Sequence, residues 1–250
     1  MVAFRDSKIL GIIPARGGSK SISKKNIRLF CGKPLVAWKI EAARASGVFD
    51  RIICSTDDAE IAEVAKRFGA EVPFMRPAEL AQDATPTLPV LQHAVSHMRE
   101  AEGYTPDIIV TLEPTTPALQ PFHIREAIDL FVSSGADSVM GMVEVPTAFS
   151  PYWQFTMDDV GRLSLFTGVP TRNVIRHRQN LPKTYHRNST IYVFKPELLF
   201  AAEPSIYGGD ARAYIMERKY SGDLDTPEDW IEAEKEMLRL IAGDKAVPSF

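Results

Sequence analysis

The fold is decided by residues 9–26, which read ILGIIPARGGSKSISKKN. Residues 9–14 form a short, mainly apolar run that ends at a proline. This run is far shorter than the roughly 20 residues that span a bilayer, and it is too short for the core of a signal peptide. We therefore expect a buried strand over residues 9–14. Residues 16–26 are polar and strongly basic, so we expect a loop there, ahead of the next helix.

Short apolar runs alternate with helical patterns along residues 1–145. This alternation is typical of βαβ units and predicts an α/β fold with a mostly parallel sheet flanked by helices. The expected strands cover residues 51–55, 71–74, 107–111, 138–145 and 189–194. The expected helices cover residues 33–46, 59–68, 87–99 and 122–134, and a last helix begins at the capping box TPED of residues 226–229.

Residues 146–187 interrupt the alternation, because they are rich in proline and aromatic residues and show no helical pattern. We interpret this segment as an inserted β-rich arm or packing surface. The rest of the chain gives no sign of a domain boundary, so we expect a single domain over residues 1–250 that carries the arm.

The charge balance excludes several classes of protein. Lys and Arg number 29 and Asp and Glu number 32, for a net charge of -3, so the chain has no global positive field for wrapping nucleic acid. Cys31 and Cys54 lack the spacing of a disulfide framework or a structural zinc site. We expect a cytoplasmic protein that binds neither nucleic acid nor membranes.

The basic loop is the first candidate site, because ligands of open α/β sheets bind at the carboxyl ends of the strands. It carries the cations Arg16, Lys20, Lys24 and Lys25, and a pair of glycines that lets the backbone approach an anion closely. The loop lacks the spacing of an ATPase P-loop and of a dinucleotide-binding fingerprint. Polyphosphate binding and a simple solvated basic loop both fit this pattern.

Asp223 and Asp225 form the second candidate site, just ahead of the last helix. In an extended segment, side chains two residues apart lie on one face and can grip one hard cation such as Mg²⁺. Acidic residues at this position also cap a helix and complement its dipole. Both interpretations stay open from the residues alone.

Several isolated residues are weaker candidates. Arg76 could contact phosphate or anchor a loop, and Arg178 could serve an anionic substrate or a subunit interface. Thr115, Thr116 and Asn188 are possible hydrogen-bonding groups at strand ends. The sequence shows no order of residues typical of covalent catalysis by serine or cysteine.

Five motifs together resemble the acylneuraminate cytidylyltransferases, which activate sialic acid and related nine-carbon acid sugars as CMP-sugars. In order they are IIPARGGSKSISKKN (12–26), STD (55–57), RPAELAQD (76–83), LEPTTP (112–117) and DLDTPEDW (223–230). The resemblance covers nearly the whole chain. It implies a Rossmann-like α/β sheet with an extended dimerisation arm, supplied here by residues 146–187, and a homodimer.

The resemblance also implies a role for each matching position. The expected nucleotide-binding residues are Ala15, Arg16, Gly17, Gly18, Ser19, Lys25, Asn26, Arg76 and Thr87. The expected sugar-binding residues are Glu113, Thr115, Thr116, Arg178, Tyr185 and Asn188, with the arm contributed by the partner subunit. The expected catalytic residues are Arg16, Lys20, Lys25 and Asp225, and the expected Mg²⁺ ligands are Asp223 and Asp225.

The chain departs from the family pattern in a few places. The family usually has glycine where Ser21 stands and proline where Ser23 stands, and many members have glutamine where Glu113 stands. His186-Arg187 replaces the more usual Arg-Pro. These departures suggest a legionaminate- or pseudaminate-type sugar rather than plain sialic acid.

The expected reaction is attack of the sugar's anomeric hydroxyl on the α-phosphate of CTP, with release of pyrophosphate. The alternatives are a GTP-using guanylyltransferase, a sugar-1-phosphate nucleotidyltransferase, and a non-catalytic module that binds the nucleotide. All of them require the basic loop, and only the enzymes require the acidic couplet as well.

Overall fold

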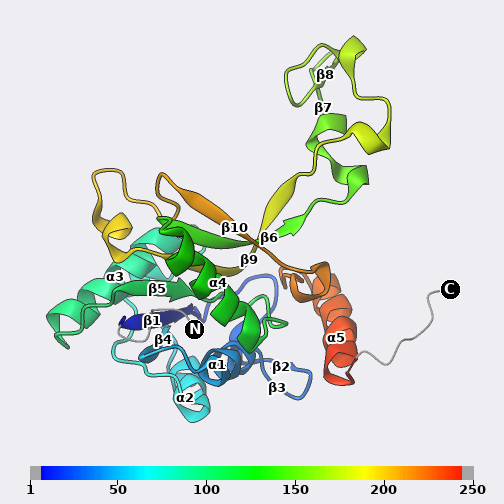
Figure 1. Cartoon of the computed structure of the whole chain (residues 1–250). Coiled ribbons are helices and arrows are strands. Elements are labelled where there is room, and N and C mark those ends of the chain that lie inside the picture. Colours follow the sequence, from blue (N-terminus) through cyan, green and yellow to red (C-terminus); the bar gives the residue numbers. More distant parts are fainter. Residues whose placement is uncertain (1–6, 244–250) are drawn as a thin grey trace.

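A six-stranded sheet forms the centre of the computed structural model, which describes residues 7–243 (Figure 1). Residues 1–6 and 244–250, the ends of the predicted single domain, lie outside the described residues. The strand order is β10-β6-β9-β5-β1-β4, and only β9 runs antiparallel to its neighbours. The prediction of a mostly parallel α/β sheet is confirmed. The strands are β1 (Ile9–Pro14), β4 (Arg51–Ser55), β5 (Ile108–Thr111), β6 (Ser138–Glu144), β9 (Tyr185–Phe194) and β10 (Ala211–Ile215).

Helices cover both faces of the sheet. In β1 the side chains alternate, so that Ile9 and Ile13 face one apolar cluster while Leu10 and Ile12 face the other. The first cluster includes residues from α1 (Leu35–Ser46), α2 (Ala59–Phe68) and α4 (Pro121–Ser134). The second includes residues from α3 (Thr87–Glu100) and the short 3₁₀ helix η7 (Pro196–Phe200). A strand apolar on both faces is what burial between two helical layers requires.

A third apolar cluster attaches the last helix, α5 (Pro227–Ile241), to the beginning of the chain. Trp230 of α5 packs edge-on against Phe30, with 5.3 Å between the ring centroids. Phe30 belongs to a small hairpin of β2 (Leu29–Phe30) and β3 (Lys33–Pro34). Ile22 of the basic loop and Leu224 of the acidic segment are buried in the same cluster. The predicted capping box is present: Thr226 Oγ1 accepts a hydrogen bond from the backbone N–H of Asp229 at 3.1 Å.

The structure corrects some of the predicted boundaries. Residues 71–74 are not a strand, because Glu71 and Met75 make only isolated bridges to the edge strand β4 and its end. The helix expected from residue 33 begins at Leu35, since the two preceding residues pair in β3. β10 was not predicted; its sequence ARAYI is largely exposed and carries no apolar run.

The arm between β6 and β9 projects away from the sheet (Figure 1). It contains one hairpin of β7 (Phe155–Met157) and β8 (Leu163–Leu165), and four short 3₁₀ turns. Since β9 begins at Tyr185, residues 185–187 of the predicted arm belong to the sheet. None of the helices within residues 7–243 is long and apolar enough to cross a membrane.

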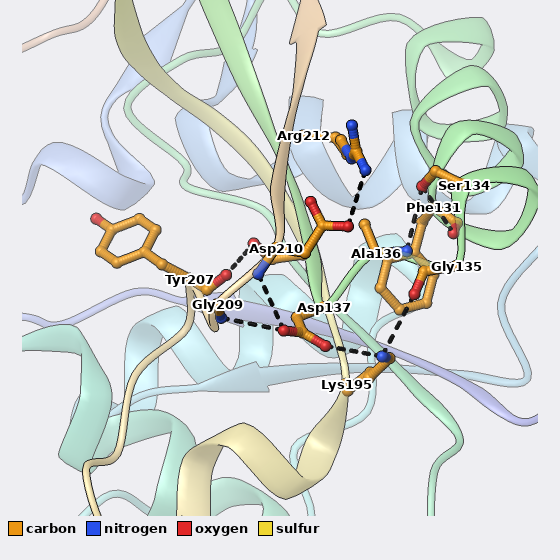
Figure 2. A network of polar contacts seen from close by, with 11 residues as sticks. Phe131, Ser134, Gly135, Ala136, Asp137, Lys195, Tyr207, Gly209, Asp210 and Arg212 are labelled. Atoms are coloured by element: carbon orange, nitrogen blue, oxygen red, sulfur yellow. Dashed lines mark hydrogen bonds and ion pairs between the residues drawn. The ribbon is translucent and has the colours of Figure 1, made fainter.

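Asp137 fastens the edge strand β10 to the sheet (Figure 2). One carboxylate oxygen accepts the Lys195 ammonium at 2.8 Å, and the other accepts the backbone N–H groups of Gly209 and Asp210 at 3.0 and 3.1 Å. These donors, the Lys195 ammonium first, lower the pKa of Asp137 to about 2. The carboxylate therefore stabilises the fold only while it is ionised.

We expect Asp137→Asn to destabilise the protein at pH 7. The folded pKa is lower than the ordinary value of 3.8, so the stabilisation is present above that value and is lost as pH falls towards 2. Urea unfolding should show a gap between wild type and variant at pH 7 that narrows at pH 3. Asp210→Asn is the matched control, because that side chain forms its ion pair with exposed Arg212. Equal effects of the two substitutions would contradict the role of Asp137.

Candidate active site

The basic loop is fixed against the end of β4. The backbone N–H of Ala15 donates to Ser55 O at 2.9 Å, and the N–H of Gly17 donates to Asp57 Oδ1 at 3.0 Å. A Cβ on Gly17 would lie 2.6 Å from Asp58 Oδ2, and Asp58 is itself held because it caps α2. Only glycine therefore fits at position 17, and the loop lies close over the end of the sheet.

Hydrogen bonds inside the loop set its shape. The backbone N–H of Ser19 donates to Gly17 O at 3.0 Å, and Arg16 Nη1 donates to Gly18 O at 2.9 Å. Asn26 is buried, and its Nδ2 donates to Arg16 O at 2.9 Å. Asn26 thus supports the backbone of the loop from below.

The cations of the loop are held by carboxylates. Arg16 and Lys20 both form ion pairs with Asp83, and Lys24 pairs with Glu60. The two cations, Lys20 first, lower the pKa of Asp83. Asp83 therefore places a negative charge between the two side chains that were predicted to hold a triphosphate.

Lys25 joins the basic loop to the acidic couplet. Its Nζ donates to Leu224 O at 2.7 Å and lies 3.6 Å from Asp225 Oδ1. Lys25 and Leu224 are separated by 199 positions in the sequence. The structure thus brings the two predicted candidate sites together at one place.

Asp223 carries an oxygen suited to a metal ion. Its Oδ1 is buried and forms no hydrogen bond with any residue that the structure describes. Burial raises the pKa of Asp223, and the Thr115 hydroxyl opposes this rise. A buried carboxylate oxygen without a partner fits an incoming hard cation. Among residues 7–243 no group of three or more acidic, histidine or cysteine side chains forms a complete metal cage, so the remaining ligands would have to come from phosphate and water.

A cavity of about 490 Å³ opens beside Asp223. Its lining includes Asp223 and Thr111, the two residues of this region that carry a buried polar atom without a partner, Oδ1 and Oγ1 respectively. Buried polar atoms in proteins nearly always have a partner, so this pair indicates a missing ligand. The other lining residues are Thr87, Leu88, Glu113, Thr115, Arg187, Ser189, Tyr192, Pro204, Ser205, Ile206 and Tyr207.

Glu113 brings to this cavity a carboxyl group that is a weaker acid than usual. Removal from water raises the pKa of Glu113 to about 7, and Asp223 adds to the rise. Lys39 of α1 opposes it. Lys39 is fully buried and its Nζ donates to Thr190 O at 3.2 Å, while burial lowers its pKa well below the usual range.

The remaining predicted residues are spread more widely. Arg76 is buried and anchors its loop, because its Nε and Nη2 donate to Ser55 Oγ and O at 3.1 and 2.5 Å. The Thr116 hydroxyl closes a turn by donating to Glu113 O at 3.1 Å. Asn188 is buried and its Nδ2 donates to Ser221 Oγ at 2.9 Å, which steadies the segment before Asp223.

Four of the six predicted sugar-binding residues do not line the cavity beside Asp223, namely Thr116, Arg178, Tyr185 and Asn188. Arg178 lies in a 3₁₀ turn of the projecting arm and is exposed, and Tyr185 is exposed at the base of the arm. Neither lines the cavity beside Asp223. Thr87 does line it, at the start of α3.

Comparison with known proteins gives the family. A family model described as Cytidylyltransferase matches residues 10–246. The chain is 32% identical to the pseudaminic acid cytidylyltransferase of Campylobacter jejuni (strain 81-176), over 89% of this chain and 93% of that protein. It is also 32% identical to the CMP-N,N'-diacetyllegionaminic acid synthase of Legionella pneumophila, over 92% of this chain and 96% of that protein. This chain belongs to the cytidylyltransferase family.

Two further comparisons bear on length and fold. The N-acylneuraminate cytidylyltransferase A of Danio rerio is 34% identical over 93% of this chain, but the chain spans only 51% of that protein. Among solved structures, CMP:2-keto-3-deoxy-manno-octonic acid synthetase complexed with CTP superposes with a TM-score of 0.69 at 17% identity, and covers 94% of this chain and 100% of that one. This similarity confirms the predicted Rossmann-like cytidylyltransferase fold.

Sequence reasoning missed several residues of this cytidylyltransferase site. Lys39 stands in the apolar stripe of its helix with Leu35, Val36, Ile40 and Ala43, and a lysine in such a stripe was a visible signal. Asp83 lies in a quoted motif but received no role. Thr111 gave no signal, because a buried threonine usually finds a partner.

We expect Asp83→Asn to tighten the binding of inorganic triphosphate to this cytidylyltransferase. The substitution frees Arg16 and Lys20, and exposed ion pairs of this kind change affinity by roughly two- to tenfold. Calorimetric titration measures the dissociation constant directly. Glu63→Gln on α2 is the control for the change in net charge, since it releases only Lys66. Weaker binding in Asp83→Asn would show instead that Asp83 holds the cations in place for the ligand.

Proposed function

We propose that the protein transfers the cytidylyl group of CTP to the anomeric hydroxyl of a nine-carbon α-keto acid sugar and releases pyrophosphate. The observation that carries this proposal is the contact of Lys25 with both Leu224 O and Asp225, which joins a phosphate-type loop to an acidic couplet. Family membership and the names of the bacterial relatives support the choice of CTP and an acid sugar.

The sugar proposed is of the legionaminic or pseudaminic type, with sialic acid as the simpler relative. Glu113 supports this choice, because it stands where many family members have glutamine. With a pKa of about 7, its carboxyl group can donate or accept a hydrogen bond near neutral pH. A cavity of this volume, with the free polar atoms of Asp223 and Thr111, is suited to a polyhydroxylated ligand.

In the proposed mechanism the protein mainly positions groups and neutralises charge. Arg16 and Lys20 leave Asp83 and bind the phosphates of the nucleotide, and backbone N–H groups of the glycine loop approach them. Lys25 stays between the loop and the couplet, where it stabilises charge that develops on the leaving pyrophosphate. Thr115 holds the couplet in place, since its carbonyl oxygen accepts the N–H of Leu224 at 3.0 Å.

Asp223 and Asp225 would hold a divalent cation, proposed to be Mg²⁺. Their oxygens are the ligands that Mg²⁺ prefers, and the free Oδ1 of Asp223 fits this role. When bound, the ion supplies positive charge near the α-phosphate and favours ionisation of the attacking hydroxyl. The raised pKa of Asp223 also fits, because a cation would restore the ionised form.

The arm supports a homodimer as a second part of the proposal. Its side chains Met157, Val160 and Phe166 are apolar and 71%, 74% and 65% exposed, which is unusual for a free surface. Arg178 lies on the same arm and does not line the cavity of its own protomer. In a dimer the arm of one protomer would bring Arg178 to the sugar site of the other.

The cellular setting proposed is the cytoplasm, where CTP is available and the free thiols of Cys31 and Cys54 stay reduced. We propose no nucleic acid or membrane partner, in keeping with the near-neutral charge of the chain.

We expect pyrophosphate release when the protein is given CTP, Mg²⁺ and an acid sugar. The screen combines CTP or GTP with sialic, legionaminic, pseudaminic and deaminated neuraminic acids. Release with GTP alone would favour a guanylyltransferase, and release only with phosphorylated sugars would favour a sugar-1-phosphate nucleotidyltransferase. Nucleotide binding without any metal-dependent release would favour a non-catalytic module.

The acidic couplet supplies the control for this screen. Asp223→Asn with Asp225→Asn should lower turnover by several orders of magnitude at a temperature where both proteins are folded. The thermal unfolding midpoint is measured as well and should fall, because Asp223 supplies part of the negative charge near buried Lys39. Glu228→Gln, at an exposed acidic position of the same helix start, should keep full activity. Full activity of the double variant would refute the metal assignment.

We expect a dimer by sedimentation at micromolar concentration. Met157→Asp with Phe166→Asp should shift the protein to a monomer, because charges on an apolar interface are costly to bury. Leu29→Asp is the control, being similarly exposed but away from the arm. A monomeric wild type would overturn this part of the proposal.

A further inference from the structure

At the base of the arm, two neighbouring side chains of β9 line different cavities. His186 lines a cavity of about 710 Å³ beside α5, and Arg187 lines the cavity of about 490 Å³ beside Asp223. This follows from the period of two along a strand, since both residues belong to β9 and pair with β6. The replacement of Arg-Pro by His-Arg thus places an arginine in the cavity proposed for the sugar.

Arg187 is the only cation among the residues that line this cavity, all of which lie in the described part of the chain. The other charged lining residues, Glu113 and Asp223, are acidic. An acid sugar that enters here meets two carboxylates that repel its own. Within one protomer, a favourable site for its carboxylate therefore requires Arg187, the one cation among the described lining residues.

The guanidinium of Arg187 is held in place but not neutralised. Its Nη1 donates to Tyr207 Oη at 3.3 Å, and within residues 7–243 Arg187 forms no ion pair with a carboxylate. Arg16, Lys20, Lys24 and Lys25 each have a carboxylate partner. Arg187 thus differs from every cation of the basic loop.

Two phenols lie near this guanidinium, and one of them, Tyr207, accepts its hydrogen bond. Tyr207 lines the same cavity, and Tyr192 is buried beside it, with 6.5 Å between their ring centroids. Burial raises the pKa of Tyr192, which also responds to the charges of Arg187 and of Glu113. Tyr192 therefore lies near both charged groups. An arginine held by the Tyr207 hydroxyl keeps most of its five donors for a ligand.

We propose that Arg187 binds the carboxylate of the acid sugar and that Tyr207 is its positioning residue. This inference rests on the proposed function and adds to it the group that selects an acid over a neutral sugar. The planar guanidinium matches a carboxylate in a two-point contact, which an ammonium cannot make. Arg187 comes from the protomer's own β9, so this contact does not depend on the arm of a partner.

The test compares acid sugars with their C1 carboxamides. The probes are N-acetylneuraminate, N,N'-diacetyllegionaminate and pseudaminate, each paired with its carboxamide, and both turnover and calorimetric binding are measured. Arg187→Gln should raise KM for the acid roughly 10- to 100-fold, leave KM for CTP unchanged, and abolish the preference for acid over carboxamide. Arg187→Lys should recover only part of the affinity, and Tyr207→Phe should weaken acid binding by a smaller factor.

The control is Arg212→Gln, which removes an exposed arginine of β10 that pairs with Asp210. It should change neither the KM for the acid sugar nor the KM for CTP.

Pyrophosphate release with an unchanged acid preference in Arg187→Gln would overturn this inference and leave the proposed function standing. A raised KM for CTP alone would also overturn it, since Arg187 would then bind phosphate. Acid-selective binding that depends on Arg187, without pyrophosphate release, would contradict the proposed function and uphold the inference. Failure of every acid sugar to bind would overturn both.

Discussion

The structure depends on how Leu224 is held between two aspartates. Its side chain is fully buried with Phe30 and Trp230, which contributes about 2 kcal/mol of stability. Its N–H donates to Thr115 O, and its carbonyl oxygen accepts Lys25 Nζ. Because side chains alternate along an extended segment, burial of Leu224 turns Asp223 and Asp225 away from this apolar cluster, where Asp223 is partly buried beside the cavity and Asp225 is exposed. One apolar side chain thus fixes the couplet, the basic loop and the end of β5 relative to one another.

The site is electrostatically balanced before any ligand binds. Asp83 lies between Arg16 and Lys20, and Lys25 lies beside Asp225. A polyphosphate would therefore exchange with existing carboxylates, rather than neutralise bare cations. Such an exchange lowers the net gain in affinity, but it keeps the loop ordered in the absence of ligand. It also favours release of the pyrophosphate product, because Asp83 can pair again with Arg16 and Lys20.

The sequence allowed the central elements to be predicted because their signals are local. The apolar run of residues 9–14, the glycines Gly47 and Gly69 that end α1 and α2, and the capping box at Thr226 all act within one turn or strand. The sequence also allowed the prediction that the basic loop and the couplet meet at one cleft. The loop follows the first strand, and the couplet precedes the last helix. The contact through Leu224 was not predictable, because the burial of that side chain depends on Phe30 and Trp230, which are remote in sequence.

Other features depend on long-range contacts that no local pattern contains. β10 is exposed, and it joins the sheet only through its pairing with β6 and the Asp137 network. The cavity that contains Arg187 is formed by α3, β5, β9 and residues 204–207, so its members cannot be grouped from spacing. Asn188 has the hydrogen-bonding chemistry expected of it, but it uses that chemistry on Ser221 and Thr190.

Lys39 shows how the core and the site are linked. A lysine that is fully buried in an apolar stripe is unfavourable unless negative charge lies nearby. Glu113 and Asp223 supply that charge, and in return Lys39 limits the rise in the pKa of Glu113. A change at Glu113 therefore alters the core beneath it as well as the cavity above it. For this reason Glu113 and Lys39 must be considered as a pair, because a substitution at either position changes the electrostatic environment of the other.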